Sequence, residues 1–104
     1  MKLWLDDLRP APTEAGWVLA HSVNEAILAL TTQEITFASL DHDLGEYEPD
    51  GGDGIKLLLW MAEHNIWPTD GIEIHSMNPV GAANMLSLVE RYAPYRATRR
   101  NKPF

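Results

Sequence analysis

Short apolar segments alternate with helical patterns along this chain of 104 residues, and that alternation limits the folds it can adopt. Some of these segments are apolar or small throughout, which is typical of strands covered on both faces of a parallel sheet. Strands that alternate with helices predict an α/β fold, in which a mostly parallel sheet lies between helical layers. The length suits one domain over residues 1–104. The predicted strands are Lys2–Leu5, 17–21, 36–40 and 71–75, with a further short run at 95–99.

Three helices are predicted from capping signals and apolar periodicity. Ser22 and Glu25 have the S-x-x-E spacing of a capping box, which marks a helix start. Asn78 and Pro79 mark another, because asparagine is a preferred N-cap and proline prefers the first helical position. The middle helix is recognised by a broad apolar stripe. The predicted helices cover residues 23–31 and 54–65, and the third begins after Asn78.

The segment between the first two strands predicts no full helix. Residues 8–16 contain two prolines and a glycine, which are typical of a loop. A parallel crossover normally needs roughly a dozen residues or more, so the first helix should be shortened or missing. Two arrangements remain open. Either an extended, proline-braced loop crosses over, or the second strand lies elsewhere in the sheet.

Polar residues follow three of the predicted strands, at the point where each strand ends. In open parallel sheets, ligands bind at the carboxyl ends of the strands. We therefore expect these side chains to meet at one edge of the sheet and to form a single site. The residues placed there are Asp6, Asp7, Asp41, His42, Asp43, His75 and Ser76.

Three of these carboxylates are the predicted metal ligands. Asp6, Asp7 and Asp41 would repel one another unless a cation lay among them. Oxygen ligands without cysteine suit a hard ion, so Mg²⁺ or Mn²⁺ is the predicted cofactor. The alternative for the Asp6–Asp7 pair is a simple Asx turn that begins a loop.

The predicted partner of such a site is a small phosphorylated ligand. The amide groups at the start of the third helix favour an anion, and Ser76, Asn78 and Arg9 are the candidates for binding it. Alternatively, Ser76 forms only a local turn and Arg9 pairs with Asp7. His42 and His75, whose ordinary pKa values lie near neutrality, are candidate general acids and bases. Asp43 is the third candidate catalytic residue.

Composition excludes several other classes of protein. The chain has no cysteine, which excludes disulfides and thiolate chemistry and fits a cytoplasmic location. Its net charge of −7 argues against non-specific binding to nucleic acid. It has no apolar run of about 18 residues and no basic-then-apolar start, so neither a membrane span nor a signal peptide is expected.

Four motifs together resemble the cyclic-phosphate processing receiver-like family, which is related to the receiver domains of two-component signalling. They are "LWLDDLRPAP", "GW", "SLDHDLG" and "HSMNPVGAANM". The resemblance implies a receiver-like (flavodoxin-like) three-layer sandwich. It matches Asp6 and Asp7 to the receiver acidic pair, Asp41 or Asp43 to the phosphoacceptor, and Ser76 to the hydroxyl residue. It also implies a metal-dependent phosphoesterase that acts on nucleotide-derived cyclic phosphates.

Departures from an ordinary receiver favour hydrolysis over phosphorelay. The usual lysine after the fifth strand is missing, although Arg96, Arg99 or Lys102 can replace it, and histidines adjoin the central aspartate and the serine. Three alternatives stay open. The chain is a stand-alone signalling receiver, a binding module that docks through Trp60 and Trp67, or a haloacid-dehalogenase-like phosphatase with an Asp-x-Asp motif. The last is disfavoured because that motif normally ends the first strand. The sequence leaves the exact substrate and the oligomeric state open.

Overall fold

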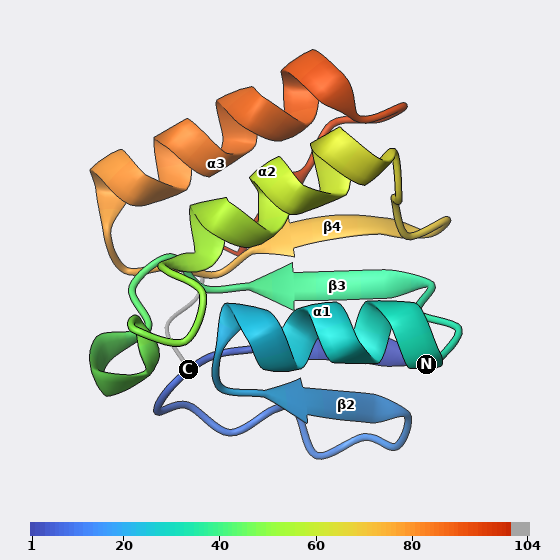
Figure 1. The fold of residues 1–104 in the computed structure, drawn as a ribbon. Coiled ribbons are helices and arrows are strands. Elements are labelled where there is room, and N and C mark those ends of the chain that lie inside the picture. Colours follow the sequence, from blue (N-terminus) through green and yellow to red (C-terminus); the bar gives the residue numbers. More distant parts are fainter. Residues whose placement is uncertain (101–104) are drawn as a thin grey trace.

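A computed structural model of the chain describes residues 1–100, which form five strands, three α-helices and one 3₁₀ helix (Figure 1). The predicted helix and strand types are confirmed, with bounds that shift by at most three residues. The elements in chain order are β1 Lys2–Leu5, β2 Trp17–Ala20, α1 Val23–Thr32, β3 Phe37–Leu40, η1 Gly45–Tyr47, α2 Gly54–His64, β4 Gly71–Ile74, α3 Pro79–Tyr92 and β5 Thr98–Arg99.

The five strands form one sheet in the order β2-β1-β3-β4-β5, and every neighbouring pair is parallel. Strand β2 therefore lies beside β1 at the edge of the sheet. Residues 6–16 cross between the two strands without a helix, so the proline-braced loop is the arrangement that the chain adopts. The ladder continues beyond both ends of β1, because Lys2 N donates to Gly16 O and Asp6 N donates to Ala20 O.

The three helices lie on one face of the sheet, where α1 contacts α2 and α2 contacts α3 (Figure 1). The strand order explains this arrangement. The connections through α1, α2 and α3 all step in the same direction across the sheet, and right-handed crossovers then lie on the same side. Only the step from β1 to β2 runs the other way, and it has no helix. The α/β class and the missing first helix are confirmed, whereas residues 1–100 lack the second helical layer of the expected three-layer sandwich.

Side-chain alternation along β1 separates the core from the other face of the sheet. Leu3 and Leu5 are fully buried and belong to a single apolar cluster with residues from all three helices. Trp4 points to the opposite face. There it packs edge-on against Trp17, with ring centroids 5.7 Å apart, and its Nε1 donates to the Arg9 carbonyl at 2.9 Å. The 6–16 loop thus passes over the face that carries Trp4, which we call the helix-free face of the described chain.

The predicted helix caps are present. Ser22 Oγ accepts a hydrogen bond from Glu25 N at 3.1 Å, and Asn78 Oδ1 accepts one from Gly81 N at 3.0 Å. Helix α2 ends at Asn65, whose left-handed backbone (φ 52°) stops the helix. None of the helices in the described part of the chain combines the length and apolar character of a membrane-spanning segment.

Candidate functional site

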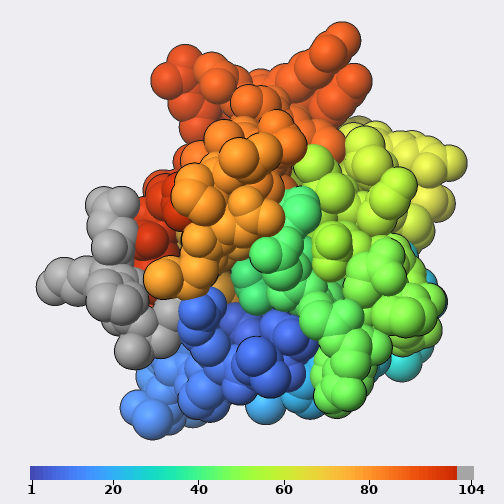
Figure 2. Space-filling model, turned by 90° about the vertical axis from the view of Figure 1, so that its left-hand side faces the viewer, coloured from blue at the N-terminus to red at the C-terminus, as the bar shows by residue number. Residues whose placement is uncertain are grey.

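The carboxyl ends of β1, β3 and β4 open onto one pocket, as the sequence predicts. Figure 2 looks at this edge of the sheet, where the segment after β1 (blue), the segment after β3 (green) and the start of α3 (orange) meet. The pocket has a volume of about 330 Å³. Its lining residues are Asp6, Asp7, Leu8, Arg9, Asp41, Asp43, Gly45, Ser76, Met77 and Asn78.

Asp6 is buried, and both of its carboxylate oxygens are hydrogen-bonded. Oδ1 accepts from the backbone N–H groups of Leu8 and Arg9, each at 2.8 Å, so Asp6 forms the Asx turn that was the alternative interpretation of the Asp6–Asp7 pair. Oδ2 lies 3.0 Å from His75 Nε2. Burial by itself would raise the Asp6 pKa, but the hydrogen bonds from His75, Arg9 and Leu8 outweigh it and hold that pKa below its ordinary value. Asp6 is therefore ionised and held in one orientation.

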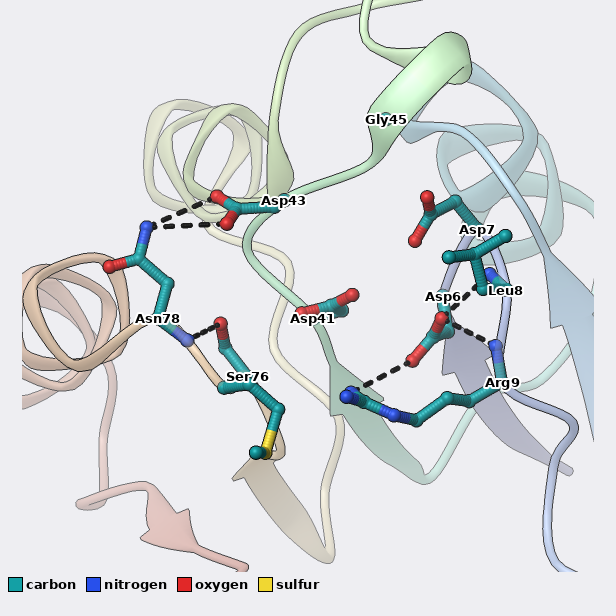
Figure 3. Close-up of a pocket in the computed structure, with 10 residues that line it drawn as sticks. Asp6, Asp7, Leu8, Arg9, Asp41, Asp43, Gly45, Ser76 and Asn78 are labelled. Atoms are coloured by element: carbon teal, nitrogen blue, oxygen red, sulfur yellow. Dashed lines mark hydrogen bonds and ion pairs between the residues drawn. The ribbon is translucent and has the colours of Figure 1, made fainter. Parts of the chain in front are cut away.

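The pKa values of the neighbouring carboxylates, Asp7 and Asp41, shift in the opposite direction from that of Asp6. Burial, followed by the charge of Asp6, raises the Asp41 pKa to about 6. Burial also raises the Asp7 pKa, and the charge of Asp6 adds to it. In Figure 3 the carboxylates of Asp6, Asp7 and Asp41 surround one space. Burial is the larger cause of both raised pKa values and the neighbouring negative charge adds to it, and a bound cation would relieve that repulsion.

Two groups in residues 1–100 bring ligand atoms close enough together for a metal ion. Asp6, Asp41 and His75 each offer one atom, and these atoms lie within 4.8 Å of one another. Because Asp7 also lines the pocket, all three predicted metal ligands lie together. Gly45 makes room for Asp7, since a Cβ at Gly45 would collide with Asp7 Oδ2. The second group contains His42, Asp43 and Asp53, of which Asp53 is the N-cap residue of α2.

His75 lies behind Asp6 rather than in the pocket. Its ring stacks on Trp4 with centroids 4.0 Å apart and planes 5° apart, and its Nδ1 lies 2.7 Å from Ser39 Oγ. Burial lowers the His75 pKa, and Asp6 opposes that effect. The side chain is fully buried and does not line the pocket. The position therefore favours a role in orienting Asp6 over direct contact with a ligand.

His42 also lies outside the pocket lining, whereas Asp43 is part of it. His42 Nδ1 is 2.6 Å from Asp43 Oδ1, and its ring packs so closely on Gly81 that a Cβ there would lie 2.5 Å from the ring. Asn78 Nδ2 donates to both oxygens of Asp43, at 3.2 and 3.4 Å (Figure 3). The hydrogen bonds from His42 and Asn78 lower the Asp43 pKa.

The three residues predicted to bind an anion, Arg9, Ser76 and Asn78, all line the pocket. Ser76 is buried, and its Oγ accepts from Asn78 N at 3.0 Å, so the local turn is present at the pocket wall. Arg9 pairs with Asp6 rather than with Asp7, since Arg9 Nη1 is 4.0 Å from Asp6 Oδ2. Asp6 is the closer partner because its side chain turns back over residues 8 and 9.

Of the three basic residues proposed to replace the receiver lysine, Arg99 lies beside the site. Arg99 Nη2 donates to the Ser76 carbonyl at 2.9 Å. Arg96 instead forms an exposed ion pair with Glu90, and Lys102 lies outside the described residues. Trp60 and Trp67, the predicted docking residues, are each half-buried against the core.

Sequence reasoning missed two residues that lie behind the site, on the helix-free face of the sheet. Ser39 on β3 and Glu73 on β4 are paired in the sheet register, and Ser39 Oγ donates to Glu73 Oε2 at 2.6 Å. The available signal was one polar residue inside each of the apolar strands "FASL" and "GIEI". Because successive strand residues point to opposite faces, those two positions lie away from the helices and share the face that carries His75.

Comparison with known proteins confirms the predicted receiver-like (flavodoxin-like) fold. The family model described as "cyclic-phosphate processing receiver domain" matches residues 1–91. Among solved structures, the chain is similar to the receiver domain of the Francisella response regulator 1452, with a TM-score of 0.64 and 16% sequence identity. That similarity covers 98% of this chain and 84% of the other. No curated protein matches the sequence.

Proposed function

Because the chain belongs to the cyclic-phosphate processing receiver domain family, we propose that it is a divalent-cation-dependent phosphoesterase acting on nucleotide-derived cyclic phosphates. The observation that carries this proposal is the crowding of Asp6, Asp7 and Asp41 around one space. A site built only to bind an apolar or anionic partner has no use for three converging carboxylates. A site that binds a divalent cation together with a phosphate uses carboxylates of this kind as ligands of the cation.

Asp6, Asp7 and Asp41 would hold Mg²⁺ or Mn²⁺, since oxygen ligands in a pocket without cysteine suit these ions. The raised pKa values of Asp7 and Asp41 support this assignment. When bound, such an ion polarises phosphoryl oxygens and lowers the pKa of a coordinated water. Asp6 is already held in place by Leu8, Arg9 and His75, so little further ordering of this ligand is needed.

Ser76, Arg9 and the start of α3 would hold the phosphate. Ser76 and Asn78 line the pocket where this helix begins, and its amino-terminal end attracts negative charge. Arg9 reaches across the floor of the pocket toward Asp6 (Figure 3). Its guanidinium can pair with a phosphate oxygen once the charge of Asp6 is shared with a cation.

Asp43 is the predicted catalytic residue that faces the pocket. Its oxygens can accept a proton from water there, and His42 Nδ1, 2.6 Å from Asp43 Oδ1, can share that proton. Asn78 fixes the orientation of the Asp43 carboxylate. His75 orients the Asp6 carboxylate and does not contact the ligand itself, because Asp6 lies between His75 and the pocket.

The test is a metal-by-substrate screen on the purified protein. The panel contains 2′,3′-cyclic nucleotides, 3′,5′-cyclic nucleotides, cyclic dinucleotides, RNA ending in a cyclic phosphate, and linear phosphoesters. Each is assayed with Mg²⁺, with Mn²⁺ and with a chelator. We expect turnover of at least one cyclic phosphodiester that needs the metal and is lost in Asp41→Asn. Metal binding without turnover of any member would reject the enzyme proposal.

A stand-alone signalling receiver is the second candidate, and one observation favours it. Asp41 follows β3 beside the acidic pair, while Ser76 follows β4, which is the arrangement that the receiver resemblance assigns to a phosphoacceptor and its hydroxyl partner. The phosphorylation experiment in the Discussion separates this candidate from the phosphoesterase.

A further inference from the structure

A line of polar side chains connects the floor of the pocket to the helix-free face of the sheet. It runs from Asp6 through His75 and Ser39 to Glu73. Asp6 Oδ2 lies 3.0 Å from His75 Nε2, His75 Nδ1 lies 2.7 Å from Ser39 Oγ, and Ser39 Oγ lies 2.6 Å from Glu73 Oε2. These residues come from β1, β3 and β4 and from the positions next to them, so the line crosses three strands.

The interior of this line is shielded from solvent. Ser39 is fully buried, and His75 is 2% exposed. Trp4 covers the imidazole face, with planes 5° apart. At the outer end, Arg100 holds Glu73, since Arg100 Nε and Nη2 each lie 3.2 Å from Glu73 Oε2. Buried polar groups of this kind are stable only when their partners are in place, so the line is a built feature of the fold.

We propose that Ser39 and Glu73 are positioning residues of the pocket, which set the orientation of His75 and, through it, the orientation of Asp6 as a cation ligand. The proposal rests on the function proposed above and assigns two residues that the active-site motifs leave out. Neither residue lines the pocket, so neither touches a ligand.

The geometry shows how the orientation is transmitted. Ser39 Oγ lies 2.6 Å from Glu73 Oε2 and 2.7 Å from His75 Nδ1, so it links the carboxylate to the imidazole ring and fixes the direction in which Nδ1 points. With Nδ1 anchored there and the ring held flat on Trp4, Nε2 can face only Asp6 Oδ2. Both Asp6 oxygens then have fixed partners. This is the same principle by which outer partners of metal-binding side chains orient the ligand and raise metal affinity.

The first measurement follows the imidazole itself. Long-range ¹H–¹⁵N NMR resolves the two ring nitrogens of His75, assigned with His75→Gln, while His21, His42 and His64 serve as internal references. In Ser39→Ala the Nδ1 resonance should move, because its partner is lost. In Ser39→Thr, which keeps a hydroxyl, it should return toward the wild-type position. An unchanged Nδ1 resonance in Ser39→Ala would overturn the proposal.

The second measurement is Mn²⁺ affinity with the metal alone as the probe. Changes to such outer partners typically weaken metal binding by about 10–100-fold, so Ser39→Ala should raise the Kd by about tenfold or more. Glu73→Gln should raise it less, and Ser39→Thr should restore it. The matched control is Ser87→Ala, an exposed serine on α3 that should match wild type. If the Kd is unchanged in Ser39→Ala although the Nδ1 resonance shifts, these contacts stabilise the fold without affecting cation binding. That result would also overturn the proposal.

The two proposals can fail separately. If wild type binds no Mn²⁺, the metal-dependent function fails and the positioning role toward a cation fails with it, while the NMR experiment still decides whether the line exists in solution. If wild type binds Mn²⁺ and Ser39→Ala binds it equally well, only the positioning role fails. Thermal melts of each variant confirm that loss of affinity does not reflect loss of the fold.

Discussion

His75 Nε2 lies 3.0 Å from Asp6 Oδ2, although the two residues are 69 positions apart in the chain. This contact determines which side chains of the candidate site face the pocket and which lie behind them. A histidine at the end of β4 would reach the ligand if it pointed into the pocket. Here it points sideways beneath Asp6, so the acidic side chains face the ligand and the imidazole supports one of them.

The first prediction concerns metal binding and stability. Mn²⁺ or Mg²⁺ should raise the melting temperature of wild type, because a ligand that binds only the folded state stabilises it by about 2.7 kcal/mol at 100 times its Kd. The double variant Asp6→Asn/Asp7→Asn should lose this gain, whereas Glu63→Gln, an exposed acid on α2, should keep it. If millimolar metal leaves the melting temperature of wild type unchanged, the cation site is contradicted.

The second prediction follows from the Asp41 pKa. The pKa of Asp41 is about 6 in the folded protein and 3.8 ordinarily, so the folded state holds this proton more tightly. The contribution of Asp41 to the free energy of unfolding should therefore fall as pH rises from about 4 to 6, by roughly 3 kcal/mol in total.

Urea unfolding at several pH values, without metal, measures this effect as the difference between wild type and Asp41→Asn. The comparison with Asp41→Asn is necessary because Asp6 contributes a pH dependence of stability with the opposite sign. Its lowered pKa gives stability at neutral pH that is lost as pH falls below its ordinary value. The relative stability of Asp41→Asn should rise between pH 4 and 7, and a difference that stays constant over that interval would contradict the assignment.

The third prediction separates the phosphoesterase from the signalling receiver. Acetyl phosphate with Mg²⁺ should leave no phosphoryl group on Asp41 or Asp43, because a hydrolytic site has no use for a lasting acyl phosphate. Intact-mass spectrometry provides the measurement, with an ordinary response-regulator receiver as positive control. A stoichiometric mass gain that disappears in Asp41→Asn would favour the receiver.

The fourth prediction assigns Ser76 to phosphate binding. Ser76→Ala should lower the rate of cyclic-phosphate hydrolysis without abolishing it, since the start of α3 and Arg9 remain at the pocket. Asp41→Asn should abolish the rate under the same conditions. Steady-state kinetics of the two variants make the comparison, and a Ser76→Ala protein with no residual activity would point instead to a serine nucleophile.

The fifth prediction concerns Gly54, the first residue of α2. Gly54 N donates to the His42 carbonyl at 2.7 Å, and a Cβ at this position would overlap the backbone carbonyl of Asp41. Gly54→Ala should therefore destabilise the protein by about 1–3 kcal/mol. Backbone entropy alone would make alanine favourable by about 0.5–1 kcal/mol, so the sign of the change in urea unfolding tests the contact.

The sequence by itself determined the elements and the edge of the sheet that carries the polar residues. Apolar runs, the caps at Ser22 and Asn78, and the prolines after β1 act within a few residues of chain, so their effects can be read locally. The parallel arrangement then places Asp6, Asp41 and Ser76 together, because all three follow strands that end at the same edge.

Only the tertiary structure decided which polar groups face the pocket and which stand behind it. The orientation of His75 depends on Ser39, Glu73 and Trp4, whose strands become neighbours only when the sheet pairs. The packing of the His42 ring against Gly81 and the single helical layer of residues 1–100 likewise depend on strand order and crossover direction. These are contacts between residues that are far apart in the chain. Local sequence patterns do not predict them, because the orientation of each side chain depends on a partner that the fold brings close.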